Sequence, residues 1–312
     1  MKTNLIPIIT LALLAGCSGK SDTVGPEPLP PTPVPVSIDL RAGVSVVTKG
    51  PVEEGSSVTV SVEGWESSGD VSYAGGSTWR SSASVSAHSS ASSITLVPEQ
   101  YYSSDDATRT YIQAWYPAEP SDGGSVSFKR GSQGYSGDGT DDVLLSTAVF
   151  GTKSSPVSVP LQFDHMTTRL SFRVKKGEGL AEGTRIEKIE LQGSEIPTGI
   201  DLSRHAVIFS ASDLDAGVTP SEIPDTSAAA GVSLMVRPTS DNTTLTLHIE
   251  TSHPEESGRA VYEGVSIAPD SGEGFAVGKS YVIDLTFQQT GVSVSASIEP
   301  WPTPIDNTVP VQ

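Results

Sequence analysis

The stretch Val58-Thr59-Val60-Ser61-Val62 alternates apolar and polar side chains, which is the pattern of a β-strand that buries one face. The same alternation recurs in residues 36–40, 245–249 and 292–295. Glycine, proline and aspartate clusters interrupt the chain at short intervals, and no long stretch shows the 3.6-residue period of a helix. The sequence therefore predicts an all-β protein whose antiparallel strands form β-sandwiches.

The length of the chain predicts more than one sandwich. Roughly 275 residues follow a proline-rich segment, which is long for a single sandwich domain. We expect an N-terminal β-sandwich domain over residues 36–157, a C-terminal one over 158–302 and a C-terminal tail over 303–312. Within them, the serine-rich residues 81–93 indicate a loop or weak edge strand, and residues 211–216 indicate one helical turn.

The N-terminus has the layout of a signal peptide. Lys2 precedes a short apolar stretch over residues 5–14, which is shorter than the roughly 20 residues of a membrane-spanning helix. Residues 14–17 read LAGC and look like a bacterial lipobox. We expect residues 1–16 to be removed and Cys17 to carry lipid that anchors the protein in a membrane. The alternative is an ordinary signal peptide with a chance cysteine.

Cys17 is the only cysteine, so a lipidated chain has no thiol for a disulfide, a zinc site or a nucleophile. Residues 17–35 combine this cysteine with a proline-rich linker that favours polyproline II. Removing residues 1–16 takes away one lysine and changes the net charge from −18 to −19. Because no basic patch is evident, we expect no nucleic-acid partner.

A search for catalytic motifs gives no enzyme hypothesis. The chain has no Gly-x-Ser-x-Gly elbow, phosphate-binding loop, dinucleotide fingerprint or His-Glu-x-x-His motif. Asp138, Asp141 and Asp142 lie in a glycine-rich loop where carboxylates can ligate Ca²⁺, but their spacing departs from the calcium-loop pattern and favours solvated turn residues. We expect no enzyme activity, metal or cofactor apart from the lipid on Cys17.

Two further residue types leave alternatives open. His165 follows Phe163-Asp164, where a packing role at a strand entry is favoured over catalysis. Tryptophan side chains can stack on sugars, although tryptophan on a strand more often packs in a core. The four tryptophans are Trp65, Trp79, Trp115 and Trp301.

Several segments, in order, resemble the fimbrillin family of Bacteroidetes, including its Mfa-like and FimA-like branches. The resemblance covers essentially the whole chain, and the shared order of the segments behind a lipobox carries it. The segments are residues 48–50 (TKG), 54–58 (EGSSV), 111–117 (YIQAWYP), 142–145 (DVLL), 161–166 (LQFDHM), 169–174 (RLSFRV), 281–285 (YVIDL) and 298–301 (IEPW).

The resemblance implies two tandem transthyretin-like β-sandwich domains in a structural subunit, or a tip or anchor adhesin, of a type V pilus. In that family a protease releases the first strand with its lipid, and a strand of a neighbouring subunit fills the groove. Here residues 36–47 form the candidate releasable strand, with cleavage after Lys49 or Arg41. Lys49 replaces the family's usual arginine, and the alternative is that it only caps a strand before Gly50-Pro51.

We therefore expect a surface-exposed outer-membrane lipoprotein that joins other pilus subunits by β-strand exchange and binds a host or bacterial surface receptor. The C-terminal tail is either a disordered end or a donor strand, since Ile305, Val309 and Val311 are apolar but its prolines remove backbone donors. The alternative function is a glycan-binding cell-surface lipoprotein that uses exposed tryptophans.

Overall fold

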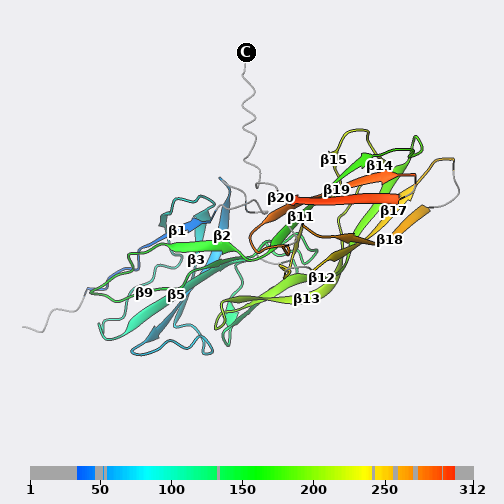
Figure 1. Ribbon diagram of the computed structural model, residues 1–312. Coiled ribbons are helices and arrows are strands. Elements are labelled where there is room, and N and C mark those ends of the chain that lie inside the picture. The colour runs from blue at the N-terminus through cyan, green and yellow to red at the C-terminus, as the bar shows by residue number, and fades with distance from the viewer. Residues whose placement is uncertain are drawn as a thin grey trace, which may run out of the picture. The chain divides into compact units, whose positions relative to one another are not determined.

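The structure is a computed structural model that describes residues 34–45, 52, 55–131, 134–240, 243–255, 259–269, 273–289 and 291–298. Every helix or strand assigned within these residues is a β-strand, so the all-β prediction is confirmed. No described segment is a helix of the length and hydropathy that crossing a membrane requires. The described residues from Pro35 onward form one compact unit, and their strands make three sheets (Figure 1).

An eight-stranded sheet contains the first strands of the chain. Its order is β3-β2-β5-β8-β10-β1-β4, with β9 beside β5. Its two edges approach each other, because Ser82 of β3 bridges Val97, three residues beyond β4. The strands are β1 (Leu40–Val44), β2 (Ser57–Ser67), β3 (Trp79–Ser86), β4 (Ser92–Ile94), β5 (Arg109–Tyr116), β8 (Leu144–Ser146), β9 (Val149–Gly151) and β10 (Leu161–His165).

The other two sheets contain most of the later strands. The seven-stranded sheet has the order β18-β17-β12-β7-β6, with β13 and β14 beside β12, and the five-stranded sheet has the order β15-β11-β19-β20, with β16 beside β11. The seven are β6 (Ser121–Asp122), β7 (Ser125–Ser127), β12 (Arg185–Asp201), β13 (Ala206–Asp215), β14 (Ser221–Glu222), β17 (Leu245–Ser252) and β18 (Arg259–Ile267). The five are β11 (Thr168–Lys176), β15 (Ala228–Ala229), β16 (Leu234–Val236), β19 (Ser280–Gln288) and β20 (Gly291–Ile298).

Two apolar cores and a smaller junction cluster hold the sheets together. The first core lies within the eight-stranded sheet, and the second core lies between the five- and seven-stranded sheets. The junction cluster joins side chains from both halves of the chain. Its buried members are Trp65, Trp115, Val126, Phe128, Tyr135, Val143, Leu145, Ile200 and Leu202.

The boundary between the halves differs from the expected break between residues 157 and 158. β10 pairs with β1 and β8 in the first sheet, and β11 is the first strand of the five-stranded sheet. In the other direction, β6 and β7 extend the seven-stranded sheet through pairing of β7 with the end of β12. Strand pairing, rather than the proline-rich sequence near Pro156, therefore decides where one half ends, and the halves share a sheet.

One local expectation is corrected, and another agrees with one of its two alternatives, because β3 is an edge strand of its sheet. Residues 211–215 belong to β13 and pair with β12, so they are extended rather than helical. Within residues 81–93, the part up to Ser86 belongs to β3 and places Ala83 and Val85 in the first core. Alternation of small apolar residues with serine is enough for a buried strand face, because each inward position needs only modest volume there.

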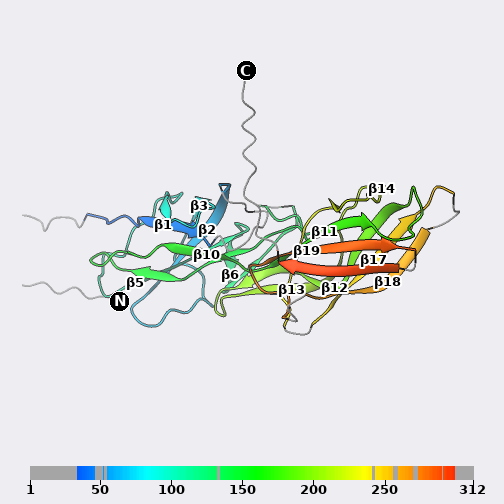
Figure 2. The same ribbon diagram turned by 45° about the horizontal axis from the view of Figure 1, so that its top comes forward.

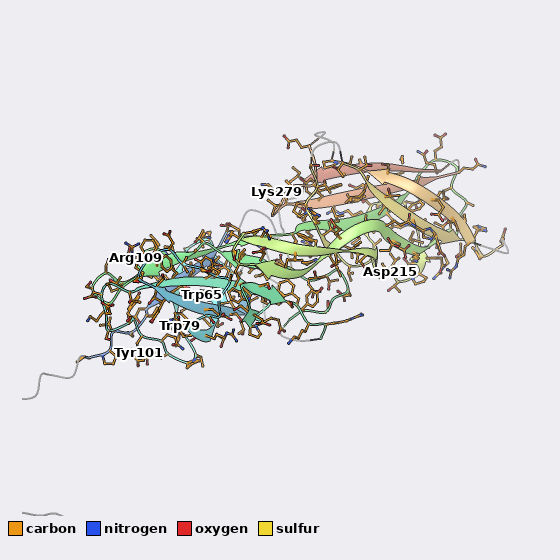
Figure 3. All side chains as sticks on the ribbon, turned by 90° about the horizontal axis from the view of Figure 1, so that it is seen from below. Trp65, Trp79, Tyr101, Arg109, Asp215 and Lys279 are labelled. Atoms are coloured by element: carbon orange, nitrogen blue, oxygen red, sulfur yellow. The ribbon has the colours of Figure 1, made fainter. Side chains whose placement is uncertain are left out.

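Trp79 of β3 lies across the backbone of Gly64 of β2, its cross-strand partner; Figure 3 labels Trp79 and also Trp65, the residue after Gly64. A Cβ added at Gly64 would lie 2.1 Å from Cε2 of Trp79. The indole therefore occupies the space of the missing side chain, which is a reason for glycine inside a strand.

We expect Gly64→Ala to destabilise the protein by about 1–3 kcal/mol, because the added methyl group must displace the Trp79 ring. The measurement is the free energy of unfolding in denaturant. Gly69→Ala is the matched control, since a Cβ there meets nothing within 4 Å. Equal stability of the two variants would contradict the close packing at Gly64.

Candidate functional site

Strand β1 lies between two neighbours that are distant in sequence. It runs parallel to β10 on one side, where Ala42 aligns with Leu161 (Figure 2). It runs antiparallel to β4 on the other side, where Leu40 aligns with Ile94. β1 is therefore an inserted strand, and most of the predicted segment 36–47 lies within it or directly before it.

The sequence of β1 explains how it fits this place. Ile38, Leu40, Ala42 and Val44 alternate along the extended chain and point into the first core, where they are 4%, 3%, 1% and 1% exposed. Arg41 lies between them and is exposed. The period-two pattern thus separates a buried face from a solvent-facing one. Without β1, the first core would have an apolar groove beside β10.

A short segment, residues 88–94, covers the other edge of β1, and we call it the clasp. Its β4 part pairs with the strand, and beyond this pairing the N–H of Val44 donates to the carbonyl of His88 at 2.9 Å. Nη2 of Arg41 donates to the carbonyl of Ala91 at 3.0 Å. β4 has three residues and β10 has five, so β4 is the shorter of the two strands that pair with β1.

A buried ionisable pair lies where the first sheet ends. Nδ1 of His165 is 2.7 Å from Oδ2 of Asp142, and both side chains are almost inaccessible to solvent. Oδ1 of Asp142 accepts hydrogen bonds from the Thr167 hydroxyl and the Val143 N–H. Burial lowers the pKa of His165, but the charge and hydrogen bond of Asp142 more than offset this and raise it above its ordinary value of 6.5.

The glycine-rich loop before Asp142 connects the two halves of the chain. The Tyr135 hydroxyl donates to the carbonyl of Pro197 in β12 at 2.7 Å. The N–H of Met235 in β16 donates to the carbonyl of Gly139 at 2.5 Å. Together with the buried His165–Asp142 pair, these contacts fix the loop against β12 and β16.

The acidic side chains of this loop are occupied by protein donors. Asp141 accepts hydrogen bonds from the N–H groups of Ser136 and Gly137, and Asp138 accepts one from the N–H of Thr140. Although burial raises the pKa of Asp138, hydrogen bonds from Ser136 and Thr140 lower it below 3.8. Among the described residues, no group of three or more histidine, cysteine or acidic side chains is arranged to hold a metal ion.

The described tryptophans do not form an exposed sugar-binding surface. Trp65 and Trp115 are 3% and 0% exposed and belong to the junction cluster. The indole N–H of Trp115 donates to the carbonyl of Glu119 at 2.8 Å. Trp79 is half-buried and packs against the first core, and Trp301 lies outside the described residues.

Comparison with known proteins gives the family. The model of the fimbrillin-like family matches residues 46–301. The chain belongs to this family. Fimbrillins are structural rather than enzymatic proteins, which agrees with the expectation that this fimbrillin-like chain is not an enzyme. No curated protein sequence matches the chain.

Solved structures share the fold of this fimbrillin-like chain. A candidate cell adhesion protein from Bacteroides uniformis is 18% identical with a TM-score of 0.53, and the match covers 85% of this chain and 98% of that one. One from Bacteroides ovatus is 15% identical, covers 87% and 99%, and has a TM-score of 0.53. One from Parabacteroides distasonis is 10% identical, covers 87% and 98%, and has a TM-score of 0.52.

The predicted modification and processing residues have different outcomes. Cys17 and Lys49 lie outside the described residues. Arg41 lies in the middle of β1, where its backbone pairs with Ser93, so a cut after it would divide a paired strand. The clasp, its contact with β1 and the buried partner of His165 were not predicted from the sequence. Gly43, a glycine inside an alternating strand, was the one available signal of a close backbone approach.

We expect the His165–Asp142 pair to make stability depend on pH. Because the pKa of His165 is raised in the folded state, its stabilising contribution is fully present below the unfolded-state pKa of about 6.5 and is lost as pH rises through the folded-state pKa. Asp142→Asn should cost on the order of 3 kcal/mol at acidic pH and flatten this dependence.

Denaturant unfolding of the wild type and of His165→Gln between about pH 5.5 and about pH 8.5 measures the effect. His88→Gln is the control, since that side chain is exposed and lies away from Asp142. A pH dependence that His165→Gln leaves unchanged would show that another group is responsible.

Proposed function

We propose that this fimbrillin-like chain is a surface subunit of a type V pilus, assembled by exchange of β1 for a strand of a neighbouring subunit. The observation that supports the proposal is the insertion of β1 between β10 and β4. Only residues 45–49 lie between the end of β1 at Val44 and a cut after Lys49. One cut in this region would detach the strand from the rest of the chain.

The free energy gained by burying the side chains of β1 favours replacement of this strand by another strand over an empty groove. Burial of Ile38, Leu40 and Val44 contributes roughly 1.5–3 kcal/mol each, before the cost of ordering the strand. An empty groove would expose this apolar surface and the unpaired edge of β10 to water. A donor strand that restores both the side-chain burial and the backbone pairing would therefore bind with a large gain in free energy.

Cleavage after Lys49 suits this mechanism better than cleavage after Arg41. A cut at Arg41 would leave residues 42–45 paired with β10, where Val44 remains in the first core. A cut after Lys49 would allow the whole strand to leave with whatever precedes it. The residue type favours a lysine-cutting or trypsin-like protease.

The proposal places the precursor at the outer membrane through lipid, such as palmitate, on Cys17. The Pro-rich linker over residues 17–35 would hold the strand and the core away from the membrane surface. The partners are other pilus subunits and a receptor on a host or bacterial surface. The exchange requires no metal or cofactor.

We expect protein recovered from the cell surface to begin at Gly50 and to run as SDS-resistant species of high molecular mass. N-terminal sequencing and immunoblotting of surface fractions measure both properties. Lys49→Gln should retain the original N-terminus and run as a monomer, whereas Lys129→Gln is the control lysine. A wild-type protein with an intact N-terminus and no large species would contradict strand exchange.

Cys17→Ala should abolish lipid attachment, because no other thiol is available in the chain. Metabolic labelling with a palmitate analogue should give no signal for this variant, and the protein should leave the membrane fraction. Ser18→Ala is the matched control. Label retained by Cys17→Ala would contradict the lipoprotein assignment while leaving strand exchange open.

A further inference from the structure

The buried face of β1 defines what a replacing strand must present. The inward residues of β1 and of the segment directly before it are each at most 4% exposed, and they are Ile38, Leu40, Ala42 and Val44. Interiors are closely packed, so a larger side chain at the place of Ala42 has no free volume. A polar side chain at the place of Leu40 would be buried among apolar neighbours without a hydrogen-bond partner.

The outward face of β1 is restricted at one position. A Cβ added at Gly43 would lie 3.2 Å from Cα and N of Ala91 and from the carbonyl oxygen of His88. These are backbone atoms of the clasp, which yield less readily than the end of a long side chain, and a Cβ at Gly43 would require them to shift. Asp39 and Arg41, on the same face, are exposed and leave room for other residues. The clasp therefore selects glycine at the place of Gly43.

We propose that the groove left by β1 is specific for one donor-strand pattern. The donor has large aliphatic residues at the places of Ile38 and Leu40, alanine at the place of Ala42 and valine at the place of Val44. It has glycine at the place of Gly43. This inference rests on the proposed strand exchange and identifies the chemistry of the partner. The donor is a strand whose sequence matches β1 at the places of Leu40, Ala42 and Gly43.

The chain's own C-terminal tail fails this pattern. Residues 305–311 read IDNTVPV, and residues 38–44 read IDLRAGV, so the two share the first isoleucine and aspartate and the last valine. In this register the tail places Asn307 at the leucine position, Val309 at the alanine position and Pro310 at the glycine position.

No other register corrects these mismatches. The tail after Pro302 contains no glycine. Every second side chain of a strand points to the same face. Asn307 would therefore lie on the same face as the apolar residues of the tail in either strand direction, and these are Ile305, Val309 and Val311. The partner that fills this groove is therefore a strand other than residues 303–312 of a second copy.

The first test keeps the full chain and uses β1 as its own donor. The tail sequence differs from β1 at four places, which gives the substitutions Leu40→Asn, Arg41→Thr, Ala42→Val and Gly43→Pro. Leu40→Asn, Ala42→Val and Gly43→Pro should each lower Tm by about 2–4 °C or more. Arg41→Thr is the matched control with the smallest loss, because it removes only the exposed hydrogen bond to the Ala91 carbonyl.

Gly43→Pro adds bulk and also removes the backbone N–H, whereas Gly43→Val adds bulk alone. It should still lower Tm, whereas Asp39→Val, on the same outward face, should have little effect. The proposal would be overturned if the variant with all four tail substitutions had the same Tm as the wild type. It would also be overturned if Gly43→Val did not lower Tm.

The second test uses labelled peptides and the full-length protein after cleavage at Lys49 and release of β1. A peptide of residues 35–45 should rebind, and a peptide of residues 302–312 should bind about 10- to 100-fold more weakly. The tail peptide with Asn307→Leu, Val309→Ala and Pro310→Gly should recover the lost affinity. Equal affinity of the native tail and β1 peptides would overturn the proposal.

The two tests distinguish the specificity of the groove from strand exchange, the proposed function on which it rests. If no peptide binds the cleaved protein, strand exchange itself is contradicted. The order of the Tm losses still decides the specificity of the groove, because it is measured with β1 in place.

Discussion

Strand β1 is paired along both edges, and the first core is packed around its buried face. Its neighbour β10 follows more than 100 residues later in the sequence, whereas β4 belongs to a short segment of irregular chain. The eight-stranded sheet is therefore complete only when β1 lies between β10 and β4. Stability of this half and access to its groove depend on the same strand.

The two neighbours of β1 have different roles. β10 is also paired with β8 on its other side. The clasp contains only the three-residue strand β4, and its carbonyls at His88 and Ala91 accept bonds from β1 itself. In the proposed exchange, β1 leaves contacts with both the clasp and β10. The same backbone then sets the size limit at Gly43.

The junction of the two halves shows how polar groups can be buried without a catalytic role. The carboxylate of Asp142 accepts hydrogen bonds from backbone and side-chain donors and pairs with His165. Such a pair is costly to disrupt because one partner would remain buried and unsatisfied. The contacts that link the first sheet to the later ones are the pairing of β7 with β12 and the hydrogen bond between Gly139 and Met235.

The sequence by itself determined the β class, because period-two alternation is a local property of residues such as 58–62. It also determined the pattern of β1 and the absence of any thiol other than Cys17. The tertiary structure decided which strands became neighbours: local alternation cannot specify that β1 lies between β10 and β4, or that β7 joins β12. It also decided the roles of His165, Trp65 and Gly43, because burial and close approach arise only when distant segments pack together.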